Sequence, residues 1–95
     1  SELQTILNAK GASLAVDGIA GAKTRAECHK YTINNGDSGE LTRWVQARLN
    51  AIGFNCGAAD GIAGERTMTA IYNFQQANRL GVGYLGGSDW DRLIN

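Results

Sequence analysis

Apolar residues recur at helical spacing along the chain, in short stretches that glycines separate. The clearest stretch opens near Asp37 or Ser38 with Glu40 close behind, a sequence typical of a helix start. Its apolar positions lie on one predicted face and comprise Leu41, Trp44, Val45, Leu49 and Ile52. We therefore predict a helix here that ends at Gly53.

Three further helices follow from the same reasoning. Thr24 with Glu27 three residues on has the form of a capping box and predicts a helix over 24–32, with Cys28 and Tyr31 facing inward. A helix over 67–80 turns Met68, Ile71 and Phe74 inward. Ser88 with Asp91 opens a last short helix, which carries Trp90, Leu93 and Ile94. With an N-terminal helix before Gly11, the predicted fold is all-α, a small bundle of about five short helices.

One segment, Asp-Gly-Ile-Ala-Gly, stands at both 17–21 and 60–64. A shift of 42 residues also aligns 3–11 with 45–53, which predicts a duplicated helix–loop–helix unit. We divide the chain into units 1–35 and 36–95, which we expect to pack as one domain. The residues assigned to the structure of the two loops are Asp17, Gly18, Gly21, Asp60, Gly61 and Gly64. Ile19 and Ile62 are expected to fix these loops to the core.

Charge and hydropathy remove several classes of partner. The 95 residues carry nine basic and nine acidic side chains and no basic run, so nucleic acid is a poor partner. No apolar stretch is long enough to span a membrane, and the first residues lack the pattern of a signal peptide. We expect neither a nucleic-acid nor a membrane partner.

The residues that most often carry catalysis or bind metal are few and badly spaced. Cys28 and His29 are neighbours, so on a helix they point about 100° apart, and Cys56 supplies no close second ligand. We predict no catalytic residue, metal or cofactor, and favour two buried thiols over a Cys28–Cys56 disulfide, which remains open. Asp17 and Asp60 are expected to serve their own turns. Asp89 and Asp91 are assigned to the dipole of the last helix.

The second unit resembles a known family. The residues that carry the resemblance are Gly36–Leu41, Val45-Gln46, Leu49, Gly53-Phe54, Asp60–Gly64, Thr67, Ala70-Ile71, Phe74-Gln75, Trp90 and Leu93. They resemble a peptidoglycan-binding domain of the three-helix type found on bacterial and phage cell-wall lytic enzymes. The first unit resembles a truncated copy that lacks the third helix. The resemblance implies an extracellular, wall-bound module whose partners are peptidoglycan, through its glycan or stem peptide, and a separate catalytic domain of an endolysin or autolysin.

A glycan-binding surface needs an exposed aromatic ring beside hydrogen-bonding side chains. The residues that we expect to contact ligand are Arg66, Thr67, Tyr72, Gln75, Gln76, Arg79 and Tyr84. Trp90, Phe74 and Ile71 are expected in the core, and Trp44 between the two units. Two alternatives are a structural or protein-interaction domain without glycan binding, and a small metal-dependent hydrolase that uses Cys28, His29 and Cys56.

Overall fold

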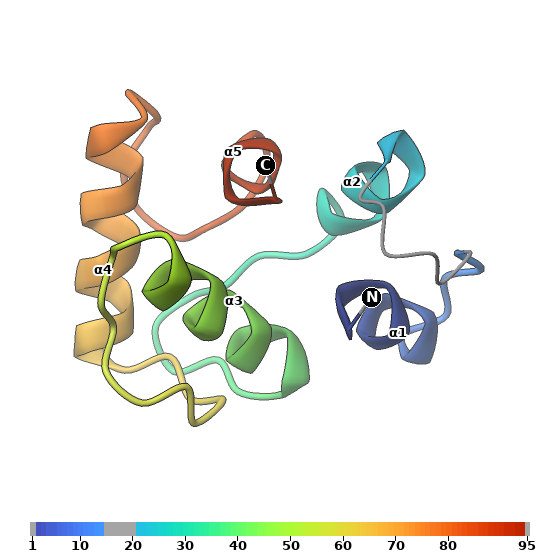
Figure 1. Ribbon diagram of the computed structural model, residues 1–95, viewed down its shortest axis with the longest axis horizontal. Coiled ribbons are helices and arrows are strands. Elements are labelled where there is room, and N and C mark those ends of the chain that lie inside the picture. The colour runs from blue at the N-terminus through green and yellow to red at the C-terminus, as the bar shows by residue number, and fades with distance from the viewer. Residues whose placement is uncertain (1, 15–20, 95) are drawn as a thin grey trace.

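The computed structural model describes residues 2–14 and 21–94, and these residues form five helices. The helices are α1 (Glu2–Ala9), α2 (Ala22–Cys28), α3 (Glu40–Ala51), α4 (Glu65–Ala77) and α5 (Asp89–Ile94). Figure 1 shows α3 and α5 in the middle, with α1 and α2 on one side and α4 on the other. The predicted all-α fold is confirmed. Over the described residues, extended pairing is limited to two isolated antiparallel bridges, Ile33 with Leu85 and Ser38 with Ile62.

A single hydrophobic core joins the helices of both predicted units. From the first unit it takes Leu3, Ile6, Leu7 and Cys28, and from the second Val45, Leu49, Phe74, Trp90 and Leu93, among others. The predicted core positions Ile71, Phe74 and Trp90 are all buried. Trp44 is half-buried and packs against the same core. None of the helices among the described residues has the length and apolar character that crossing a membrane requires.

The predicted helix starts at Thr24 and Thr67 were wrong. α2 and α4 begin two residues earlier, after Gly21 and Gly64, whose backbones are extended and which cap the helices without a side-chain hydrogen bond. Both threonines therefore lie inside the first turn, and both are buried. Instead of capping a helix, each hydroxyl accepts a hydrogen bond from a glutamine on the preceding helix.

Those glutamines reveal the same contact in both units. Gln4 Nε2 donates to Thr24 Oγ1 at 3.2 Å, and Gln46 Nε2 donates to Thr67 Oγ1 at 2.9 Å. Gln4 and Gln46 are each buried, at equivalent positions of α1 and α3. In both units, a buried amide–hydroxyl pair therefore ties one helix to the first turn of the next.

A second contact also recurs, at the loop that leaves each first helix. Asn8 accepts from the backbone N–H of Leu14 at 2.7 Å and donates to its carbonyl at 2.9 Å. Asn50, at the equivalent position, accepts from the N–H of Cys56 at 2.8 Å and donates to the carbonyl of Gly57 at 2.9 Å. Each asparagine thus bonds the backbone of the loop that follows its helix. The boundary between 1–35 and 36–95 stays a prediction.

Two helices also end earlier than predicted. α2 stops at Cys28, so Tyr31 lies beyond it, half-buried in the following segment. α4 stops at Ala77, and Arg79 then adopts a left-handed backbone with φ of 56°. That turn lets the N–H of Leu80 bond the carbonyl of Gln75 at 2.8 Å. Arg79 thus closes α4 in the conformation that glycine usually provides at a helix end.

Candidate functional site

Asp60 organises the loop that leads into α4. Its Oδ1 accepts the backbone N–H of Ile62 at 2.9 Å and Gln46 Nε2 at 3.2 Å, and these bonds hold the pKa of the carboxyl below its usual value. Asp60 thus bonds within its own loop and also to Gln46 on α3. Ile62, however, was wrongly placed in the core, since its side chain is 58% exposed and Ala63 is buried instead.

Glycine is needed at one position of this loop for two reasons. Gly61 has φ of 82°, and a Cβ there would lie 3.2 Å from the carbonyl oxygen of Gly39. Its N–H donates to Gln46 Oε1 at 2.8 Å, which places the loop against α3. In the first unit, the assigned loop residues Asp17 and Gly18, together with Ile19, lie outside the described residues.

Two of the predicted contact residues, Thr67 and Gln75, were wrongly placed at the surface. Thr67 is buried and holds Gln46. Gln75 is also buried: its Nε2 donates to the carbonyl of Tyr84 at 3.1 Å and to Asp89 Oδ2 at 3.0 Å, and its Oε1 accepts the N–H of Gly83 at 3.1 Å. Both side chains are therefore parts of the scaffold.

The other five predicted contact residues are exposed, but the structure does not bring them together. Arg66 lies in the first turn of α4 and Arg79 beyond its last residue, so the length of the helix, about 20 Å at 1.5 Å per residue, separates them. Tyr72 and Gln76 lie between them and bond each other, with 2.7 Å from Gln76 Nε2 to the tyrosine hydroxyl. Tyr84 belongs to a separate surface beyond the helix. Among the described residues, Tyr84 is the most exposed aromatic residue, at 58% against 47% for Tyr72.

Tyr84 lies beside a surface depression that we call the Tyr84 hollow. Its lining residues are His29, Thr32, Gly81, Val82, Tyr84, Gly86, Gly87, Ser88 and Asp89. Val82 is 57% exposed, so an apolar side chain and an aromatic ring stand together at this surface. Thr32 and Ser88 add hydroxyl groups, which both donate and accept hydrogen bonds.

Buried polar groups hold the loop of the Tyr84 hollow in place. Asp89 Oδ2 accepts from Gln75 Nε2 and also from the N–H of Gly86 at 3.0 Å. Asp89 is buried. Its assignment from the sequence, to the dipole of α5 alone, missed its hydrogen bonds to Gln75 and Gly86. A loop rich in glycine is thus fixed at Gly83, Tyr84 and Gly86 by two side chains beneath it.

Sequence reasoning missed the residues that the first unit brings to this hollow. His29 and Thr32 are remote from Tyr84 in sequence, and no periodic pattern marks them. Ile33 is the signal that was available, as an isolated apolar residue after α2. It is buried and pairs with Leu85 through two backbone hydrogen bonds of 2.8 and 3.0 Å.

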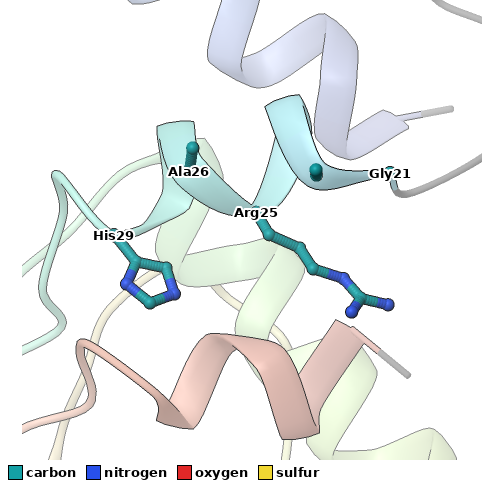
Figure 2. A pocket seen from close by; sticks show the side chains of 5 residues that line it. Gly21, Arg25, Ala26 and His29 are labelled. Carbon is teal, nitrogen blue, oxygen red and sulfur yellow. The ribbon is translucent and has the colours of Figure 1, made fainter.

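Further hollows mark the surface of the described residues, and three of them have the following linings. One is lined by Gly21, Ala22, Arg25, Ala26 and His29, and Figure 2 shows Arg25 and His29 projecting from the same side of α2, toward α5. A second surrounds Tyr72, with Asn35, Glu65, Met68 and Thr69. The third follows the loop of Asp60 and includes Arg66. The Arg66 guanidinium lies over Gly57, since a Cβ on Gly57 would be 3.0 Å from Arg66 Nη1.

Cys28, His29 and Cys56 do not form the metal site of the hydrolase alternative. The cysteines are free and buried, as predicted, and burial raises the pKa of Cys28 to about 12. His29 is turned to Asp91, with 3.1 Å between Nε2 and Oδ1. Within residues 2–14 and 21–94, no three His, Cys, Asp or Glu side chains gather as a metal ion would require. Asp91 thus pairs with His29 in addition to lying in the first turn of α5.

Comparison with known proteins identifies the family. The sequence pattern of the family described as "Putative peptidoglycan binding domain" matches residues 38–93. Among solved structures, the SleB N-terminal domain is similar, with a TM-score of 0.64 and 37% sequence identity over 67% of this chain and 89% of that chain. The matched segment begins just before α3 and includes α4, the loop of Tyr84 and most of α5. This chain belongs to the peptidoglycan-binding domain family.

Proposed function

We propose that the chain binds bacterial peptidoglycan without cleaving it, and holds an attached cell-wall hydrolase on its substrate. Family membership supports the binding activity. In this proposal the enzyme is an endolysin or autolysin, and the module works outside the cell, at the wall, after export or release by phage lysis. The mechanism is tethering, because a bound module keeps its partner near a polymer with many repeated sites.

One observation supports a ligand site at the Tyr84 hollow, where an aromatic ring is exposed above a loop that hydrogen bonds already fix. A carbohydrate ring packs its C–H face on an aromatic side chain while its hydroxyls need polar partners. Tyr84 supplies the aromatic side chain, and Thr32 and Ser88 supply the polar partners. Because Gln75 and Asp89 hold the loop before ligand arrives, binding costs little conformational entropy there.

Arg66, Tyr72, Gln76 and Arg79 take a secondary part in the proposal. They lie on surfaces outside the Tyr84 hollow. In this proposal, the two arginines form ion pairs with carboxylates of the stem peptide. Thr67 and Gln75 are buried supports of the scaffold and have no part in ligand contact in this proposal.

Retention on insoluble peptidoglycan tests the proposal. The wild-type chain is expected to pellet with the polymer while soluble fragments stay at the level of the blank. Tyr84→Ala is expected to weaken retention about tenfold, corresponding to about 1.4 kcal/mol. Lys23→Ala on α2 removes an exposed side chain outside the hollow and serves as control.

The outcomes separate the competing functions. Absence of retention by the wild-type chain supports a structural or protein-interaction domain. Fragment release without added enzyme supports the hydrolase. A loss confined to Tyr72→Ala, Arg66→Ala, Gln76→Ala or Arg79→Ala moves the contact surface to α4 and its ends.

A further inference from the structure

The Tyr84 hollow includes side chains from the part of the chain that precedes the family match. His29 and Thr32 line it, whereas the match begins at residue 38. The remaining lining residues belong to the loop 81–87 and the start of α5. One side of the proposed ligand site is therefore built by the first unit.

Backbone and side-chain bonds fix this side relative to Tyr84. Ile33 and Leu85 exchange backbone hydrogen bonds of 2.8 and 3.0 Å, and both residues are buried. Next to them, Trp90 Nε1 donates to the carbonyl of Tyr31 at 3.0 Å. Thr32 lies between these two anchors, so its position is set by the core beneath it.

Thr32 also adjoins the aromatic ring across a glycine. A Cβ on Gly86 would lie 3.0 Å from Thr32 Cγ2 and 3.1 Å from Tyr84 Cε1. The absence of a side chain at Gly86 thus leaves room for the Thr32 methyl group and the Tyr84 ring, which both lie next to this glycine. The Thr32 hydroxyl accepts a hydrogen bond from Asn34 Nδ2 at 3.1 Å and keeps its own proton to donate to a ligand.

His29 completes this side from the end of α2. Its Nε2 lies 3.1 Å from Asp91 Oδ1 on α5, and its side chain remains 40% exposed. Figure 2 shows the imidazole projecting from α2 toward α5. The contact with Asp91 orients the ring while leaving part of it open to a ligand.

The chemistry of the hollow favours a neutral ligand. Its lining residues, all within the described part of the chain, include neither lysine nor arginine. Its one carboxylate, that of Asp89, already accepts from Gln75 and from the N–H of Gly86. Hydroxyls, an imidazole and an aromatic ring suit the hydroxyl and acetamido groups of an N-acetylated sugar, whereas the carboxylates of a stem peptide favour arginine.

We propose that the Tyr84 hollow binds the glycan strand, and that His29 and Thr32 of the first unit are contact residues for its N-acetylated sugars. This inference rests on the proposed function. It gives the first unit a direct part in recognition, in addition to its place in the common core.

The probe for the test is a soluble β-1,4-linked tetramer of N-acetylglucosamine, titrated into the whole chain with detection by amide NMR shifts. Shifts are expected at Tyr84, Gly86 and Thr32. Thr32→Val keeps the shape of the side chain and removes its hydroxyl, and it is expected to weaken binding about three- to tenfold, as loss of one hydrogen bond does. His29→Ala is expected to weaken it by a similar factor.

Matched variants control for general effects on the surface. Thr69→Val makes the same change on the exposed face of α4, and Lys30→Ala removes the neighbour of His29; both are expected to stay within about twofold of the wild type. Thermal unfolding of Thr32→Val and His29→Ala confirms that each variant is folded at the titration temperature.

Each outcome bears on a stated part of the inference. Tetramer affinities of Thr32→Val and His29→Ala within twofold of the wild type, with a loss for Tyr84→Ala, overturn the role of the first unit and leave the proposed function intact. A wild-type chain that binds insoluble peptidoglycan but not the tetramer overturns the glycan assignment alone. Failure to bind the insoluble polymer overturns the proposed function itself.

Discussion

Replacing Gln46 by leucine isolates the bonds that hold the Asp60 loop to the bundle. Gln46 is almost fully buried and has four polar partners within 3.2 Å. Leucine fills similar space but leaves the N–H of Gly61 and the hydroxyl of Thr67 without this partner. Both residues are buried, so water does not freely replace the amide.

The expected cost follows from those two groups. A buried donor or acceptor that loses its partner costs about 1–3 kcal/mol, and the Thr67 hydroxyl recovers part of this by turning to a backbone carbonyl of its helix. We expect Gln46→Leu to lower the free energy of unfolding by about 2–4 kcal/mol. For a domain of this size, that corresponds to a fall in Tm of about 8–20 °C.

Urea unfolding followed by tryptophan fluorescence measures this change, and Gln76→Leu is the matched control. Gln76 is exposed on α4 and donates to the exposed Tyr72 hydroxyl, so its replacement is expected to cost under about 0.5 kcal/mol. The reasoning is refuted if Gln46→Leu costs less than about 1 kcal/mol, or if Gln76→Leu costs as much.

Three other expectations concern acid stability, thiol reactivity and core packing. The folded-state pKa of Asp60 lies below its ordinary 3.8, so the ionised carboxylate stabilises the fold at neutral pH, and this contribution is lost as pH falls through the folded pKa. Urea unfolding should therefore show that Asp60→Asn loses less stability than the wild type between pH 7 and pH 3. Burial raises the pKa of Cys28 to about 12 and also raises that of Cys56. A disulfide reagent at pH 8 should therefore label neither thiol in the native chain and both thiols in urea. Rapid labelling of the native chain would contradict this. Phe74→Ala should lower the free energy of unfolding by about 3–5 kcal/mol, since Phe74 is buried and meets Phe54 edge-to-face at 5.7 Å; a loss under 1 kcal/mol in urea would contradict that packing.

Apolar spacing was enough to find the helices and most of the core. Val45, Leu49, Ile71 and Phe74 recur with the period of a helix, and all four are buried. Such a pattern records which side of a helix avoids water, and this preference depends on residues near one another in sequence. The family resemblance was read from the same stretch, and residues 38–93 match the family.

Helix boundaries and polar burial were harder to predict. Thr24 with Glu27 has the form of a cap, yet Gly21 caps α2 and Thr24 is held by Gln4. Gln75 has an ordinary polar side chain next to the apolar Phe74, and only its partners Tyr84 and Asp89 make its burial favourable. A polar group is buried where distant groups satisfy its hydrogen bonds, and local sequence does not contain that information.

The sequence by itself determined the helical class and the family, because each is encoded in residues close along the chain. Only the tertiary structure decided the candidate site. It placed His29 and Thr32 beside Tyr84 through the pairing of Ile33 with Leu85, and it removed Thr67 and Gln75 from the surface. The physical reason is that a binding surface is a product of chain packing, in which residues remote in sequence become neighbours while polar side chains nearby turn inward to support them.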